Sequence, residues 1–406
     1  MNQGFFNKGN RRFFAGVIAY MIFAVLIYFE RSMDVMNTTV FAFSYEHGFI
    51  SRGVLGTFLQ IWDSLSPVDL LSYHTVYQIS EAATALYLLM LLLFVASILK
   101  HCNQEDEIQV KWISLLLLFL SVPMFLTCDN FGRLDVYLMI LTLFCMILLV
   151  SEKFEFLIIP AVTFATIIHQ GYVFMNLNII LAVLFYKFLM KRERRDKIKY
   201  GILLLLSFLL PSIFFLYFEF FSHTFGTEIY QEIFTLAQKL SSDGVTVHEQ
   251  VLQHEILGND IYGMEEEFHR WNREDLPIFL VLFSPFLVFG IRFFRDYAKK
   301  NKTVAEKWTG LAVLIAPLTL LPEILLKVDF GRYIFSICFY YLAIVLMLMA
   351  LKDQQVITTV KTWRDKMAAH KLMACMALLY LFLFLPFRGY RICDAVTTIV
   401  SIIFKN

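Results

Sequence analysis

Charge is scarce in this sequence. Only 17% of its 406 residues are charged, whereas a soluble domain carries about 25%. Basic and acidic residues nearly balance, at 35 and 34, so no excess charge attracts nucleic acid. The six cysteines lack CxxC spacing, which argues against a disulfide framework or a cysteine-rich zinc site.

Several motifs are missing as well. The sequence has no Walker A motif, no GxGxxG and no HExxH, although His-Glu pairs occur at 248–249 and 254–255. These absences argue against an ATP-driven transporter, a dinucleotide enzyme and a zinc hydrolase. We therefore predict no metal site and no cofactor.

Apolar residues are in excess: 59% of the chain is hydrophobic and 43 residues are Phe. A bilayer core needs about 20 apolar residues per helix. We predict an all-α polytopic membrane bundle, a single integral membrane domain over 1–406, with about eleven transmembrane helices. The predicted spans lie near 13–30, 76–99, 112–126, 136–150, 154–168, 171–187, 200–221, 277–294, 308–326, 333–351 and 372–387.

The lysines and arginines predict the orientation. Of the 35 basic residues, 24 fall on segments that lie on the same side as the N-terminus. Cytoplasmic loops carry such an excess, so the chain is predicted to be N-in and C-out. The basic run 191–195 is predicted to be a topogenic anchor, with a lipid-headgroup site as the alternative.

Two outer segments are long. The first outer loop, 31–75, contains Glu46, His47 and Arg52 among apolar residues and three glycines. It is predicted to form a short re-entrant or interfacial helix, in which Arg52 either lines a cavity or reaches toward lipid headgroups.

The second outer segment, 222–276, is acidic. Helical apolar spacing occurs twice within it, at Ile229, Ile233, Leu236 and Leu240 and at Val247, Val251, Leu252 and Ile256. We predict a small extracytoplasmic helical cap over the bundle.

Two short outer turns share a pattern. In both 123–135 and 322–333, a Phe-Gly-Arg triplet ends ten residues after a proline, and an Asp lies just before the Phe. Asp129, Asp135 or Asp329 can cap the following helix. A cation at a helix N-terminus opposes the helix dipole, so Arg133 and Arg332 need partners: these aspartates or an anionic ligand.

His169 interrupts the apolar run 154–187. The span before it has about fifteen residues and would rise only about 22 Å, short of the roughly 30 Å core. His169 is therefore predicted to lie below the outer surface, as a general acid or base or as a turn residue bonded to backbone.

The chain resembles bacterial O-antigen and capsule repeat-unit polymerases (the Wzy type), and more loosely the GT-C membrane glycosyltransferases. The first likeness is in layout: a Phe-, Leu- and Ile-rich chain, a large outer loop in the second half and arginines on outer loops. The stretch 46–56 (EHGFISRGVLG) is similar to segments of membrane proteins from bacterial glycan clusters. The GT-C likeness rests on acids in the first outer loop, Asp34 and Glu46, but no DxD pair is present.

The resemblance implies polymerisation or transfer of undecaprenyl-diphosphate-linked glycan units at the outer leaflet of a bacterial plasma membrane, in which the chain is expected to lie. Its implied partners are the polyprenyl-diphosphate-linked oligosaccharide, membrane lipid, and chain-length regulator or flippase proteins. The residues assigned to the diphosphate or glycan are Arg52, Arg133, Arg332, Glu46 and His47. Those assigned to catalysis are His169, Asp129, Asp135 and Asp329.

Two other classes remain open. A lipid-linked glycan flippase or secondary transporter also places Arg and Asp within the membrane, although alternating access needs a site near the midplane. A structural or assembly subunit would have no chemistry.

Overall fold

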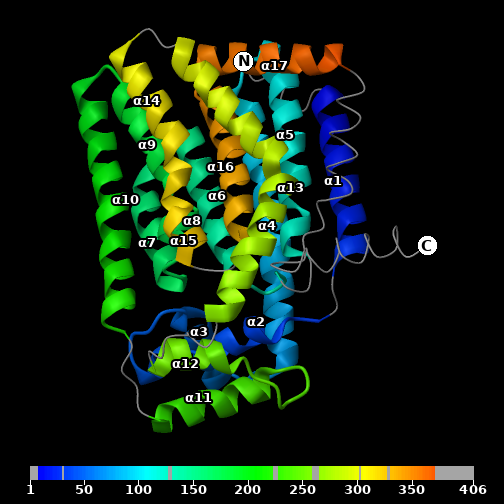
Figure 1. The fold of residues 1–406 in the computed structure, drawn as a ribbon, viewed down its shortest axis with the longest axis vertical. Coiled ribbons are helices and arrows are strands. Elements are labelled where there is room, and N and C mark those ends of the chain that lie inside the picture. Colours follow the sequence, from blue (N-terminus) through cyan, green and yellow to red (C-terminus); the bar gives the residue numbers. More distant parts are fainter. Residues whose placement is uncertain are drawn as a thin grey trace.

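The fold is built from helices across the part of the chain that the structure describes. The computed structural model describes residues 8–29, 32–126, 130–222, 227–257, 265–300, 303–326 and 330–370. No strand occurs in these ranges. The helices form a bundle with a group of small helices at one end (Figure 1). The predicted all-helical class is therefore confirmed.

Within the described ranges, six helical stretches are long and apolar enough to cross a membrane: Gly9–Tyr28, Tyr73–His101, Gln104–Phe125, Arg194–Phe220, Val304–Ile324 and Gly331–Ala350. Three shorter apolar helices, Asp135–Ser151, Glu155–Ile168 and Leu177–Met190, fall at the fourth, fifth and sixth predicted spans. The eighth predicted span lies inside the longer helix α13 (Glu265–Lys300). The eleventh, 372–387, lies outside the described residues. The chain is thus a helical membrane protein, while the count of eleven stays a prediction.

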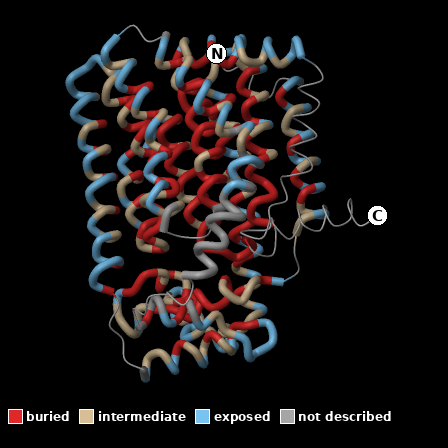
Figure 2. The backbone as a smooth tube through the Cα atoms, in the orientation of Figure 1, coloured by how far each residue is buried: buried red, intermediate tan, exposed pale blue. Residues whose placement is uncertain are grey.

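The bundle surrounds one central helix, α16. Of the most apolar stretch of α16, 94% is buried, and α16 packs on α4, α5, α9 and α13. Figure 2 shows this buried centre. The bundle helices are α1 (Lys8–Tyr28), α4 (Tyr73–His101), α5 (Glu107–Ser121), α6 (Asp135–Ser151), α7 (Ile158–Ile168), α8 (Tyr172–Met175), α9 (Leu177–Met190), α10 (Arg194–Phe220), α13, α14 (Val304–Ile315), α15 (Leu321–Leu326) and α16 (Phe330–Ala350).

One end of the bundle carries the basic segment 187–199, and α17 (Gln354–Ala369) lies across it (Figure 1). We call this the basic end. At the edge of the bundle, α10 leaves large apolar residues exposed along its length, including Ile202, Leu209 and Ile213. A helix that exposes such a face in a membrane protein faces lipid.

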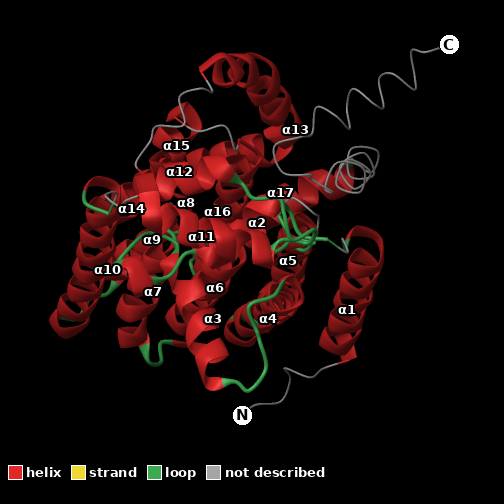
Figure 3. Cartoon of the chain, turned by 90° about the horizontal axis from the view of Figure 1, so that it is seen from below, coloured by secondary structure: helices red, strands yellow, loops and turns green. Residues whose placement is uncertain are grey.

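The opposite end is covered by a cap made from two segments far apart in the sequence. The first supplies α2 (Val35–Thr39), η1 (Val40–Ala42), η2 (Tyr45–His47) and α3 (Gly53–Leu65), and the second supplies α11 (Thr227–Leu240) and α12 (Glu249–Leu257). Helix α11 packs on α2 and η1, and α12 packs on α2. Seen from this end, the cap lies over the bundle helices (Figure 3).

The apolar spacing in the second segment explains the cap. Ile233 and Leu240 of α11 and Leu252 and Ile256 of α12 are all buried, so each helix turns its apolar stripe inward. The two segments are also joined by polar contacts. The Lys239 ammonium pairs with the Asp69 carboxylate at 2.8 Å.

Within the cap, helix α3 packs closely on the η1 segment at Gly56. A Cβ atom there would lie 2.0 Å from the carbonyl oxygen of Phe43 and 2.4 Å from that of Phe41, so only glycine fits. On its other face, α3 exposes Phe58 and Trp62. This amphipathic arrangement is typical of a helix at the membrane interface.

Candidate active site

Short helices set several polar turns back from the cap end of the bundle. Helices α6, α7 and α9 contain 17, 11 and 14 residues, or about 26, 16 and 21 Å at 1.5 Å per residue. The neighbouring α4 and α10 contain 29 and 27 residues. The polar turns at the cap ends of the short helices therefore lie within the depth that the long helices span.

An ion pair joins the two Phe-Gly-Arg turns. The Arg332 Nη1 atom lies 2.8 Å from Asp135 Oδ2, with 10% and 4% of the two side chains exposed. Asp135 is the first residue of α6, where a negative charge suits the helix dipole. Its other oxygen, Oδ1, is buried and has no hydrogen-bond partner among the described residues. Asp135 is thus one of the aspartate partners that the sequence predicted for Arg332.

Arg133 lies in the first of these turns and points to the cap. Its Nη1 atom donates to Asn130 Oδ1 at 3.4 Å, and its Nη2 atom lies 3.9 Å from Met36 Sδ on α2. The turn itself depends on Gly132, whose φ is +81° and whose missing Cβ would lie 2.2 Å from Met33 Cε. Arg133 is only 4% exposed, so its guanidinium lies between bundle and cap.

The His169 turn contacts the first outer segment. His169 is the C-cap of α7, so the helix breaks where the sequence predicted. Its Nδ1 atom lies 3.1 Å from Gln170 Oε1, and the same oxygen accepts a hydrogen bond from the buried Ser51 hydroxyl. The Gly171 N–H lies 3.5 Å from the same Nδ1 atom, at the outer limit of a hydrogen bond. The shorter contact favours the tautomer in which Nδ1 donates to Gln170 and Nε2 carries the lone pair.

Arg52 follows Ser51 directly and precedes α3. Its φ is +63°, a left-handed conformation that is uncommon for residues other than glycine. The contact of Ser51 with Gln170 places this strained residue beside the end of α7. Strain of this kind often occurs at functional sites.

The electrostatic interactions connect these groups into one cluster. His169 interacts with Arg52, Asp135 and Arg332. In the cap, His248 interacts with Asp34, Arg52 and Arg133. Arg52 therefore lies within reach of both histidines. We call Arg52, Arg133, Arg332, Asp135, His169 and His248 the recess cluster.

His248 is the member that the sequence reasoning missed. Its backbone N–H donates to Thr39 Oγ1 at 3.1 Å, and its Nδ1 accepts from the Val251 N–H at 3.3 Å. The neutral ring thus carries its proton on Nε2, as a donor. Burial lowers the pKa of His248, and Arg52 and Arg133 add to this effect, while Asp34 opposes it. The signals in the sequence were its His-Glu pair, which lacks HExxH spacing, and its place at the start of the second apolar pattern of the cap.

Other predicted site residues lie elsewhere. Glu46 is exposed on the surface. The His47 imidazole faces Glu232 of α11 at 3.6 Å, so it joins the two cap segments. Asp129 and Asp329 lie outside the described residues.

The two turns that share the Phe-Gly-Arg pattern differ in backbone. Gly132 adopts a positive φ before α6 begins, whereas Gly331 belongs to the first turn of α16. The pattern therefore does not mark two equivalent structural repeats. What the turns share is a position at the start of a helix, at the same end of the bundle.

Within the described ranges, no group of three or more His, Cys, Asp or Glu side chains is arranged to hold a metal ion. The recess cluster instead combines guanidinium, carboxylate and imidazole groups. Guanidinium groups match phosphate oxygens in geometry and charge.

The fold and the recess cluster define a polytopic helical membrane protein with a polar site beneath a cap. Comparison of the chain with protein families, with curated proteins and with solved structures finds no match.

Proposed function

We propose that this chain is a membrane enzyme that transfers or polymerises glycans carried on a polyprenyl diphosphate such as undecaprenyl diphosphate. The observation that carries the proposal is the recess cluster: arginines from three separate segments meet an imidazole and a carboxylate at the cap ends of short membrane helices. The diphosphate of a membrane lipid is anionic and stays close to the bilayer surface. Charged turns that lie between the bundle and its cap suit such a group.

The residues of the recess cluster are assigned different roles. Arg52 and Arg133 are assigned to the diphosphate, whose negative charge grows as the glycosyl bond breaks. Preorganised cations at such a position are a large source of rate acceleration. Arg332 already faces Asp135 at 2.8 Å, so its proposed role is to position this corner of the site and to share its charge with the ligand.

His169 is assigned to the acceptor hydroxyl. With Nδ1 hydrogen-bonded to Gln170, the free Nε2 takes the hydroxyl proton as the oxygen attacks the anomeric carbon of the donor sugar. Undecaprenyl diphosphate then leaves with the electrons of the broken bond. The Ser51–Gln170 contact orients the imidazole, as second partners of catalytic histidines do.

The proposal includes the finer topology. We place the cap on the outer face of a bacterial plasma membrane, with the N-terminus inside and eleven spans. The basic segment 187–199 and α17 at the opposite end support this orientation because basic residues favour the cytoplasmic side. Chain-length regulators or flippases are proposed partners on the same grounds as the family resemblance.

Reconstituted protein tests the proposal. The purified chain in liposomes is incubated with lipid-linked oligosaccharide, and product length is followed on gels. We expect Arg52→Ala, Arg133→Ala and His169→Ala to reduce product formation by at least about 10²-fold, as loss of a preorganised donor or general base does. Arg295→Ala, an exposed arginine on the basic half of α13, is the matched control.

Normal product lengths in all three variants, or no product from the wild type, would overturn the proposal. Movement of the intact lipid-linked glycan across the liposome membrane without chain growth would instead favour a flippase. Transfer from a polyprenyl-monophosphate sugar would favour a GT-C-like enzyme. The position of the cluster at the cap ends of the helices favours the enzyme over a carrier.

A further inference from the structure

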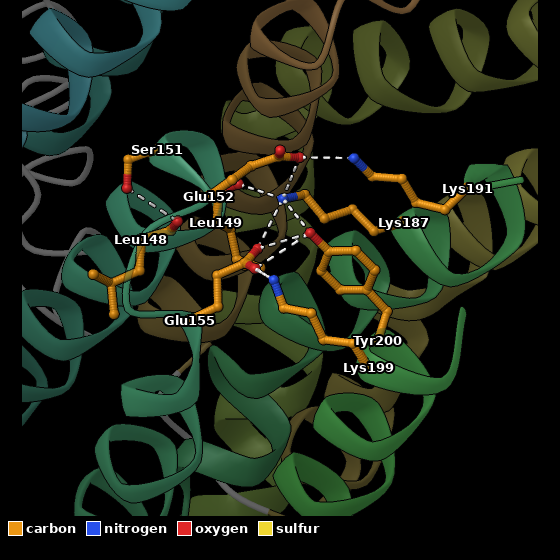
Figure 4. Close-up of polar contacts among 9 residues, drawn as sticks. All are labelled: Leu148, Leu149, Ser151, Glu152, Glu155, Lys187, Lys191, Lys199 and Tyr200. Atoms are coloured by element: carbon orange, nitrogen blue, oxygen red, sulfur yellow. Dashed lines mark hydrogen bonds and ion pairs between the residues drawn. The ribbon is translucent and has the colours of Figure 1, made fainter. Parts of the chain in front are cut away.

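A second polar feature lies at the basic end, far from the recess cluster. The Lys187 ammonium, with 1% of the side chain exposed, donates to the Leu149 carbonyl at 2.6 Å and to Glu152 and Glu155 at 3.1 and 3.0 Å. These three bonds use all three of its N–H donors. Figure 4 shows Lys187 at the centre of this network. Lys187 is therefore a structural tie between α6, α7 and α9.

The outer members of the network are accessible. Lys199 of α10 binds Glu155, and Lys191 lies 3.2 Å from Glu152. Tyr200 donates to Glu155 Oε1 at 3.1 Å. Lys199 has 46% of its side chain exposed and has donors left over after its bond to Glu155.

A groove opens beside Lys199. It has a volume of about 410 Å³ and is lined by Glu152, Phe154, Glu155, Phe156, Ile159, Lys199, Ile202 and Leu203. This volume falls within the roughly 300–1,000 Å³ of typical ligand sites. The groove lies between α7 and α10, which pack together. Its charged residues lie at the basic end, and its apolar residues continue along α10.

The apolar side of the groove leads onto the lipid-facing surface of the bundle. Ile202 lines the groove and is exposed, and Leu205, Leu209 and Ile213 continue the exposed stripe at helical spacing along α10. A molecule in the groove would therefore have a charged end at Lys199 and an apolar end along α10.

The charge favours an anionic occupant. The charged residues that line the groove are Glu152, Glu155 and Lys199. Both carboxylates are already paired with lysines (Lys187, Lys191 and Lys199), which exceed them by one charge. The neighbouring segment 192–197 adds four basic residues, Arg192, Arg194, Arg195 and Lys197, against Glu193 and Asp196. Basic pockets between membrane helices are typical sites for anionic lipid headgroups.

We propose that an anionic phospholipid binds in the groove between α7 and α10, with its phosphate at Lys199 and an acyl chain along Ile202 and the exposed stripe of α10. The site is independent of the proposed catalytic function.

Native mass spectrometry of the full chain in mild detergent tests this proposal. Phosphatidylglycerol and phosphatidylcholine are added at equal concentration, and we expect the protein to retain phosphatidylglycerol preferentially. Lys199→Gln should weaken that retention roughly fivefold, since one basic residue near an anionic surface contributes on this scale. Lys361→Gln on α17, an exposed lysine outside the groove and outside segment 187–199, is the charge control.

A second variant keeps the test independent of the ion network. Ile202→Trp fills the groove without changing charge and should also remove the preference, whereas Leu216→Trp, exposed near the other end of α10, should not. Equal retention of the two lipids by the wild type would overturn the proposal. Unchanged retention in both groove variants, or equal competition by soluble glycerol phosphate, would overturn it as well.

Discussion

The buried pair of Arg332 and Asp135 leads to the sharpest prediction about stability. With one close contact at 2.8 Å and at most 10% of either side chain exposed, the two charges are largely removed from water. Unit charges about 4 Å apart attract by about 4 kcal/mol at an effective dielectric constant near 20. Breaking a buried pair by removing one partner costs about 3–5 kcal/mol because the other charge is left unpaired.

We therefore expect Asp135→Asn and Arg332→Met each to destabilise the protein by about 3–5 kcal/mol. The double variant should be much less destabilised than the sum of the two, with a coupling energy of at least about 2 kcal/mol. The pair is monodentate, because Asp135 Oδ1 has no hydrogen-bond partner among the described residues. We therefore expect a smaller coupling energy than a bidentate arginine–carboxylate pair would give.

Unfolding in mixtures of mild detergent and dodecyl sulfate, followed by far-ultraviolet circular dichroism, measures the four free energies of this cycle. Arg364→Met with Asp365→Asn, a contact between adjacent, more exposed residues on α17, is the control cycle and should couple by less than about 1 kcal/mol. Additive effects in the Arg332–Asp135 cycle would refute the claim that this pair holds the two turns together.

Three further outcomes follow from the structure. Lys187→Met should cost about 3–5 kcal/mol in the same unfolding assay because it removes the buried ammonium that pairs with the buried Glu155 and leaves this carboxylate with Lys199 and Tyr200. Lys191→Met should cost less than about 1 kcal/mol, and equal costs would contradict this account. Gly56→Ala should cost about 1–3 kcal/mol, since its methyl group overlaps the Phe43 carbonyl, while Gly16→Ala, which meets nothing within 4 Å, should be neutral. The pKa of His248 is lowered in the folded protein, so the folded state binds fewer protons than the unfolded state. The contribution of His248 to stability is therefore present above about pH 6.5 and is lost as the pH falls. A diphosphate bound at the recess cluster should raise the pKa of His248, which an NMR titration of the ring measures. An unchanged pKa on binding would show that His248 does not lie near the ligand.

Much of the fold is predictable because a bilayer restricts the possible structures. Only helices satisfy their backbone hydrogen bonds while crossing lipid, so long apolar runs such as 76–99 and 333–351 were identified close to the observed α4 and α16. The break at His169 was predicted because the apolar run 154–187 is too long for one helix. The apolar spacing in 222–276 likewise predicted the helices of the cap.

The partners of the polar residues were not predictable in this way. Lys187 appeared in the sequence as one of several basic residues, and nothing local showed that it would be buried against Glu155, 32 positions away. His248 appeared as part of an incomplete metal motif. Both acquired their surroundings from helices that are distant in the sequence.

The sequence by itself determined that this is a helical membrane protein, because hydropathy is a local property that each segment carries alone. It also identified the residues whose charge needs compensation at the cap end, such as Arg133 and Arg332. Only the tertiary structure decided which groups compensate them: Asp135 pairs with Arg332 across 197 positions of the chain, and the cap places His248 near Arg52 and Arg133. The physical reason is that ion pairs and recesses depend on the packing of separate helices, which short-range sequence patterns do not encode.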